Sequence, residues 1–196
     1  SALLEAMNEA QVSIDRTSHD LPQPFFVIAT QNPYEFEGTY PLPESQLDRF
    51  MLRIRVGYPS AESEKTIVRA QQERHPIESI GPVVAASDVL GLQHAARAIR
   101  LDDAVLEYAL QIVSSTRRSK HLALGVSPRG TLMLTRAAQA HALVAGRGYV
   151  LPDDVKALAT AVLAHRVIST APGGDGVMDE RDKIVADLVE SIEVPV

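Results

Sequence analysis

Apolar residues recur at helical spacing along most of the chain after residue 60. Many of these segments open with a side chain that caps helices well or with acidic residues in the first turn, and polar residues fill the remaining positions. The pattern predicts five helices: Ser60 to near His75-Pro76, Ser87 as a cap to about Ile99, Asp102 as a cap to about Arg118, Ser127-Pro128 to Gly146, and Pro152 to Leu163.

Short apolar runs between prolines dominate the first part of the chain instead. Phe25 to Ala29 is β-branched and aromatic and is bounded by Pro24 and Pro33, which predicts a strand buried on both faces. Met51 to Val56 alternates and predicts a second strand, while Ser45 to Phe50 between them predicts a short helical turn. The expected fold is therefore an α/β piece followed by an all-α domain, mostly helical overall.

The two ends of the chain are less regular. Ser1 to Gln11 is rich in helix formers, and we interpret it as the interior of a helix in a chain that looks cut. Val12 to Asp15 alternates like a strand and Arg16 to Asp20 is turn-like, so a hairpin leading into the Phe25 strand is the simplest interpretation, with an irregular loop as the alternative. Residues 171–176 predict a linker, and Glu180 to Ile192 predicts a docked helix or strand.

Polar residues end the first predicted strand. Thr30, Gln31 and Asn32 follow it directly, and Pro33 forbids its continuation inside a sheet. The carboxyl ends of buried parallel strands are where open α/β sheets bind ligands. Taken alone, however, an Asn-Pro pair after a strand is typical of a simple turn.

The segment ATQNPYEFEGTYPLPESQLDRF, residues 29–50, resembles the sensor-1 strand, loop and arginine-finger turn of the MoxR family of AAA+ ATPases. Gly125 to Gly130, GVSPRG, is similar to the sensor-2 motif of that family. The resemblance extends from Ser1 to about Ile168 and implies three parts: residues 1–58 as the end of the AAA+ core, 59–170 as the helical lid, and 171–196 as linker and C-terminal segment. The family's phosphate-binding and metal-binding motifs, which should precede this stretch, are not in the sequence.

The resemblance implies roles for five residues. Asn32 would orient the attacking water, and Arg49 would reach the nucleotide of a neighbouring subunit as the arginine finger. Arg129, with Ser127 and Pro128 at the start of a helix, would bind nucleotide phosphate, within its own subunit or in the next. Ser127, Pro128 and Arg129 together form the expected nucleotide-binding residues.

Each arginine also has an ordinary interpretation. Arg49 could form a salt bridge with Asp48 or Glu44, as most surface arginines do, and Arg53 or Arg55 could be the functional cation instead. Arg129 could be a solvated side chain at a helix start.

Composition and charge argue against several other kinds of function and site. The net charge of −6 argues weakly against nucleic-acid binding, and there is no cysteine for disulfides or thiolate-metal sites. No apolar run reaches eighteen residues, so we expect no membrane span and a cytoplasmic protein. The six histidines show no metal-ligand spacing, Glu35 and Glu37 are interpreted as loop residues, and the basic cluster 117–120 as a helix end.

The family resemblance implies an ATPase that uses ATP and Mg²⁺, assembles into a ring, usually a hexamer, and remodels or matures partner proteins, including metal-cofactor insertion. Partners would be client proteins or proteins with von Willebrand factor A domains. We expect these 196 residues alone to hydrolyse no ATP. The alternatives are a non-enzymatic helical interaction module, a magnesium-chelatase-like motor subunit and, disfavoured by charge, a helix-turn-helix DNA-binding protein.

Overall fold

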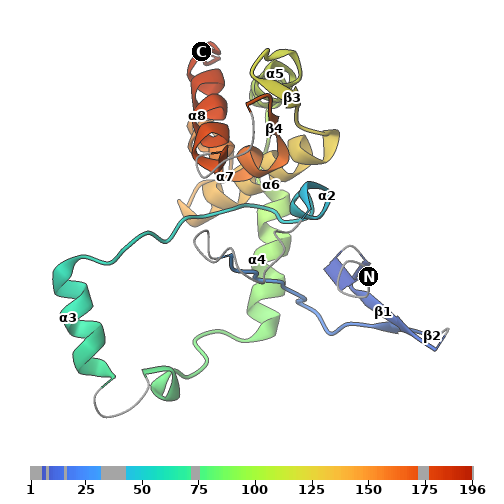
Figure 1. Cartoon of the computed structure of the whole chain (residues 1–196). Coiled ribbons are helices and arrows are strands. Elements are labelled where there is room, and N and C mark those ends of the chain that lie inside the picture. The colour runs from blue at the N-terminus through green and yellow to red at the C-terminus, as the bar shows by residue number, and fades with distance from the viewer. Residues whose placement is uncertain are drawn as a thin grey trace.

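The structure is a computed structural model, and it describes residues 6–7, 9–15, 17–31, 43–71, 76–171 and 177–195. Figure 1 shows a helical body formed by the second half of the chain, from which an extended arm carrying one helix projects. A small hairpin near the N-terminus lies apart from the body. Within the described residues, no helix has both the length and the apolar character that crossing a membrane requires.

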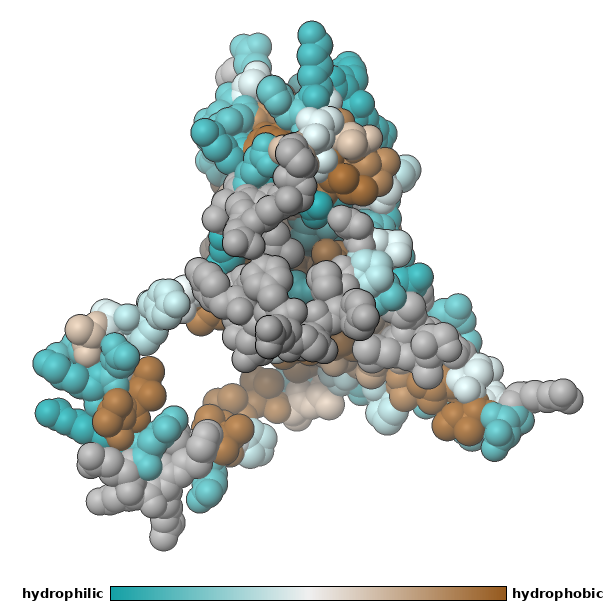
Figure 2. Space-filling model, in the orientation of Figure 1, coloured by the Kyte–Doolittle hydropathy of each residue, from teal (hydrophilic) through white to brown (hydrophobic). Residues whose placement is uncertain are grey.

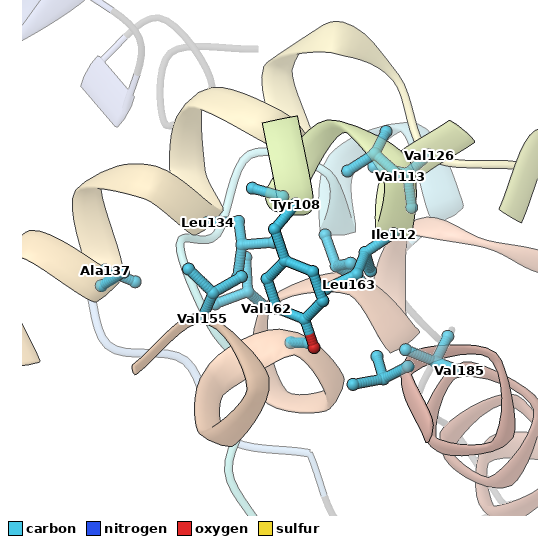
Figure 3. Close-up of a cluster of buried hydrophobic side chains, with 14 of the residues drawn as sticks. Tyr108, Ile112, Val113, Val126, Leu134, Ala137, Val155, Val162, Leu163 and Val185 are labelled. Carbon is cyan, nitrogen blue, oxygen red and sulfur yellow. The ribbon is translucent and has the colours of Figure 1, made fainter. Parts of the chain in front are cut away.

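Four helices make the body. They are α5 (Asp103–Arg118), α6 (Pro128–Val144), α7 (Pro152–Leu163) and α8 (Val177–Glu190). Helix α6 packs against α5 and α7, and α8 packs against the same two helices. Figure 3 shows side chains from all four meeting in one cluster, with the Tyr108 ring among Leu134, Val155 and Leu163. Burial of these faces drives the body to fold.

The predicted helix starts are confirmed at three places. Ser60 is the N-cap of α3 (Ala61–Ala70), and Asp102 is the N-cap of α5. Ser127 is the N-cap of α6 with Pro128 at its first position, where a missing N–H costs nothing. One assignment is wrong: α4 (Ala86–Ala98) is capped at Ala85, whose N–H donates to the Asp88 carboxylate at 2.9 Å, so Ser87 lies inside the first turn.

A short two-stranded sheet in the body was not predicted. Strand β3 (Leu122–Leu124) pairs antiparallel with β4 (Ile168–Ser169), which follows the 3₁₀ turn η2 (Ala164–Arg166) at the end of α7. The sheet ties the connection between α5 and α6 to the segment after α7. The C-terminal segment that could have been helix or strand is the helix α8, with Val185 and Val189 buried.

The arm carries α3 and η1 (Pro76–Ser79), and α4 follows it and packs against α6 of the body. No residue of α3 or α4 is buried. Apolar and aromatic side chains lie exposed along the arm and α4: Ile54, Val56, Tyr58, Ile67, Val68, Ile77, Ile80, Val83, Val84 and Leu92. Figure 2 shows brown patches between hydrophilic atoms on the arm. Helix α3 ends at Ala70 with Gln71 as its C-cap, short of the predicted end near His75-Pro76. The predicted linker residues 172–176 lie outside the described residues.

The N-terminal hairpin is confirmed with different bounds. Ala6, Met7 and Glu9 are helical, as predicted for Ser1 to Gln11, and β1 (Gln11–Ile14) then pairs antiparallel with β2 (Thr17–Asp20). The prediction of a turn over Arg16 to Asp20 is wrong, because Thr17 pairs with Ile14 and the strand continues to Asp20. The ladder keeps polar residues extended despite their weak strand preference.

The two strands predicted on either side of the motif are not strands in the structure. Phe25 to Ala29 is extended but unpaired, with Phe26 and Ile28 each 79% exposed. Met51 to Val56 forms no strand either; the Arg53 N–H donates to the Ala161 carbonyl at 2.8 Å, and the Met51 carbonyl accepts from Arg166. A strand needs a neighbour to complete its hydrogen bonds, and the described residues supply none for either segment.

A buried carboxylate fixes the turn between α6 and α7. Asp154 is 2% exposed and accepts from the Arg147 guanidinium at 2.8 Å and from the Leu151 N–H at 2.8 Å, with His141 Nδ1 at 2.6 Å. Burial raises the pKa of Asp154, but hydrogen bonds from Arg147, Leu151 and His141 outweigh it and leave the pKa at about 2. This cluster lies within the helical body and stabilises the connection between α6 and α7.

Candidate functional site

The turn that carries Arg49 is held against the body at the end of α7. The short helix α2 (Glu44–Leu47) contacts η2, and the Arg49 and Phe50 N–H groups donate to the carbonyls of Gln46 and Leu47 at 3.1 Å. The helical turn predicted from Ser45 to Phe50 is therefore confirmed in its first half and continues as a hydrogen-bonded turn.

One buried guanidinium makes most of the contacts to this turn. Arg166 of η2 has a fully buried side chain, and its Nε lies 3.2 Å from the Asp48 carboxylate. The same guanidinium donates to the carbonyls of Asp48 and Met51, each at 3.3 Å, and to those of Phe50 and Val162. Burial lowers the pKa of Arg166 to about 10, with the Asp48 charge opposing this effect and Arg129 adding to it. The backbone carbonyls on both sides of Arg49 are thereby held against η2 at the end of α7.

His165 adds a neutral contact beside this ion pair. Its Nε2 lies 3.1 Å from the Phe50 carbonyl and next to Nη1 of Arg166, while its Nδ1 is buried without a partner among the described residues. Burial and the neighbouring Arg166 cation lower the pKa of His165 to about 4, so the imidazole is uncharged at neutral pH.

This histidine makes folding sensitive to pH between about 6.5 and 4. In that window the unfolded chain protonates the imidazole and the folded chain does not, so stability falls as pH falls, by on the order of 3 kcal/mol. Urea unfolding of wild type and His165→Gln at pH 7.5, 6 and 4.5 should show a weaker pH dependence in the variant. The exposed His94→Gln variant controls for losing an imidazole; equal slopes for wild type and His165→Gln would contradict the prediction.

The arginines near the turn differ in their ion-pair and hydrogen-bond partners. Arg53 and Arg55 both pair with Asp182 of α8, Arg55 at 2.8 Å. Arg49 is half-buried, and its Nε is buried without a hydrogen-bond partner in the described part of the chain. Asp48, one of the two acids suggested as its salt-bridge partner, pairs with Arg166 instead, and the Glu44 side chain lies outside the described residues. This arrangement favours Arg49 over Arg53 and Arg55 as a cation available to a ligand.

The loop before α6 is held against the end of α5. The Val126 N–H donates to Thr116 Oγ1 at 3.0 Å, and Arg117 Nε donates to the Val126 carbonyl at 2.8 Å. Gly125 allows this approach, because a Cβ there would lie 2.6 Å from the Arg117 Cα. Arg117 of the basic cluster, together with Thr116 before it, thus has a structural role in placing the predicted sensor-2 segment.

The start of α6 offers groups that fit a phosphate. Ser127 is the N-cap, yet its hydroxyl makes no capping hydrogen bond and its Oγ is buried without a partner among the described residues. Arg129 follows two positions later, half-buried, in the first turn, and Pro128 is exposed. A helix N-terminus with its dipole, an unpaired hydroxyl and a guanidinium together suit an anionic group such as a nucleotide phosphate.

The structure brings the Arg49 turn and the Arg129 helix start to the same buried side chain. A Cβ built on Gly130 would lie 3.2 Å from Arg166 Cδ, so the first turn of α6 passes directly beside the arginine that holds Asp48 and Phe50. Asn32, Glu35 and Glu37 lie outside the described residues, so their predicted places are not observed. In the described ranges no group of three or more histidine, cysteine or acidic side chains could hold a metal ion.

Comparison with known proteins identifies the two regions. Residues 1–52 match the family described as ATPase family associated with various cellular activities (AAA), and residues 114–192 match the AAA lid domain. The crystal structure of a candidate ATPase from Cytophaga hutchinsonii superposes with a TM-score of 0.86 at 33% identity, covering 99% of this chain and 61% of that one. The chain therefore has the AAA+ fold, with a segment of the core followed by a helical lid.

The relatives narrow the class to one family. The uncharacterized protein YeaC of Bacillus subtilis is 47% identical over all of this chain and 61% of its own length, and chaperone MoxR1 of Mycobacterium tuberculosis is 38% identical over all of this chain and 53% of its own. The chain is thus homologous along its whole length to proteins of the MoxR family of AAA+ ATPases. It spans between about half and three fifths of the length of these relatives, and the alignment includes residues after Ile168.

Sequence reasoning missed Arg166 and His165. Both interrupt an otherwise apolar run from Ala159 to Ile168 apart from Thr160, and a charged side chain in such a run requires a buried partner. That signal could have identified Arg166 as a structural or functional ion pair, although the partner, Asp48, lies too far away in sequence to be predicted.

Proposed function

We propose that this chain is the sensor and lid portion of a MoxR-family ATPase, which couples ATP hydrolysis to the remodelling or maturation of partner proteins in the cytoplasm. The observation that carries the proposal is the start of α6, where the buried, unpaired Ser127 hydroxyl lies in the same turn as Arg129. Family membership and the name of the chaperone MoxR1 support a chaperone-like role. Insertion of a metal cofactor is one form that such maturation could take.

In this proposal Arg129 and Ser127 bind nucleotide phosphate at the junction of core and lid. The Ser127 hydroxyl supplies one donor at the positive end of the α6 dipole and the Arg129 guanidinium supplies two more in a plane, which suits phosphate oxygens. ATP bound there provides the phosphoryl group whose transfer to water drives the conformational work. Asn32 orients the water, because an amide donates one hydrogen bond and accepts another. In the described residues no cluster of three or more acidic or histidine side chains could hold Mg²⁺.

Arg49 completes the site of a neighbouring subunit in a hexameric ring. Its guanidinium compensates charge that develops on the transferring phosphoryl group. The partner acted on by the ring is a client protein or a protein with a von Willebrand factor A domain. The chain itself, without the remaining length of its relatives, is expected not to hydrolyse ATP.

The test is ATP binding and turnover by a polypeptide of the relatives' full length. Arg129→Ala should weaken ATP binding about tenfold, because one bidentate charged contact contributes on the order of 1.4 kcal/mol. Arg136→Ala is the matched control, since Arg136 is an exposed arginine on the same helix and should leave ATP affinity unchanged.

Turnover per subunit should also rise with protein concentration, as expected when neighbouring subunits complete each site. If Arg129→Ala binds ATP as wild type does, the assignment of α6 as the phosphate site is wrong. Negligible turnover at every concentration would instead support the non-enzymatic interaction module.

A further inference from the structure

Arg166 is placed where the two candidate nucleotide contacts of the chain meet. Its guanidinium forms an ion pair with Asp48 and donates to the carbonyls of Asp48, Phe50 and Met51, which flank Arg49 on both sides. These contacts fix the backbone from which the Arg49 side chain projects. Any displacement of Arg166 must therefore be transmitted to that turn or break four polar contacts.

The aliphatic part of the same side chain lies against the start of α6. The Gly130 position approaches Arg166 so closely that an added Cβ would sit 3.2 Å from Cδ and 3.7 Å from Nε. Gly130 follows Arg129 directly, and the Arg129 charge acts on Arg166. The start of α6 thus cannot rotate toward η2 without moving the Arg166 side chain, because protein interiors of this density transmit small shifts.

We propose that Arg166 is a positioning residue that couples the start of α6 to the Arg49 turn, so that nucleotide bound near Arg129 changes how Arg49 is presented to the neighbouring subunit. This inference rests on the proposed function, because it requires nucleotide at α6. It adds a physical connection between two candidate nucleotide contacts of the same subunit. A contiguous set of contacts, from the start of α6 through Arg166 to the Arg49 turn, carries the coupling.

The chemistry of the side chain explains why arginine is required. Five N–H donors in a plane allow one group to satisfy several carbonyls and one carboxylate together. Lysine keeps the charge and much of the length but offers a single nitrogen, so Arg166→Lys would retain a cation near Asp48 and lose the simultaneous contacts to Phe50 and Met51.

The coupling is tested by amide hydrogen exchange in the full-length polypeptide, with and without a non-hydrolysable ATP analogue. In wild type, the analogue should slow exchange of the amides at residues 49–53 at least threefold. In Arg166→Lys this protection should disappear, while the affinity for the analogue stays within about threefold of wild type. Asp154→Asn, a lid variant far from the turn in sequence and contacts, is the structural control: it should lower the melting temperature and keep the protection.

An Arg49→Ala background separates this coupling from direct contact between Arg49 and a neighbouring nucleotide. Protection that passes through Arg166 persists in that background, and its loss there would overturn the proposal. Protection that survives in Arg166→Lys would overturn the coupling and leave the proposed function intact. Absence of analogue binding in wild type would overturn the proposed function and the coupling with it. If Arg166→Lys does not fold, Asp48→Asn replaces it, since it removes the carboxylate at 3.2 Å and is expected to abolish the protection.

Discussion

Replacing Arg49 with alanine is expected to lower ATP turnover of the full-length polypeptide about a thousandfold, with ATP affinity nearly unchanged. The guanidinium would contact the phosphoryl group mainly in the transition state, so its loss reduces kcat rather than binding. The structure supports this choice because Arg53 and Arg55 are engaged by Asp182, whereas the Nε of Arg49 is buried and without a partner in the described residues. Steady-state turnover at saturating ATP measures the effect.

Arg55→Ala is the matched control, since it removes a neighbouring arginine whose contact is to Asp182 of the same chain. Its turnover should stay within about threefold of wild type, as for most surface substitutions. Retention of more than a third of the turnover in Arg49→Ala would show that Arg49 is not the finger.

Mixing Arg49→Ala subunits with Arg129→Ala subunits extends the test to the geometry of the ring. Partial recovery of turnover means that Arg49 and Arg129 act on one nucleotide from two different subunits, because mixed rings then contain some intact sites. No recovery means that both act from the same subunit. The sequence leaves this choice open.

The lid was predictable because its signals are local. Caps such as Asp102 and Ser127-Pro128 and the apolar spacing that follows them are contained within one helix, and α5, α6 and α7 lie where these patterns indicate. Strands β3 and β4 were not predictable, since each has only two or three residues and is defined by a partner strand that lies 44 to 47 residues away along the chain.

The α/β piece shows the opposite behaviour. The apolar runs at Phe25 and Met51 carry the composition of buried strands, but strand formation depends on neighbours that no described residue provides, and Phe26 and Ile28 are exposed. At the site, the resemblance to MoxR-family motifs indicated Arg49 and Arg129, while their relation through Arg166 depends on a contact between residues 48 and 166 that only the fold brings together.

The largest loss of stability is expected from Leu134→Ala. Leu134 is fully buried in α6 between α5 and α7 residues, as Figure 3 shows, and removing three carbon atoms there leaves a cavity that costs about 3 kcal/mol or more. Leu132 on the same helix is 49% exposed, so Leu132→Ala should cost less than about 1 kcal/mol. Urea unfolding followed by circular dichroism measures both.

A loss below about 1 kcal/mol for Leu134→Ala would mean that α6 is not packed as the structure shows. The comparison also concerns function, because α6 carries Arg129 at its start and Gly130 beside Arg166. The buried face of α6 holds the helix in the lid, and the polar start of the same helix meets the phosphate in the proposed function. A helix loosened at Leu134 should therefore bind ATP normally well below its melting range and lose binding only as the lid unfolds, whereas Arg129→Ala should weaken binding at every temperature.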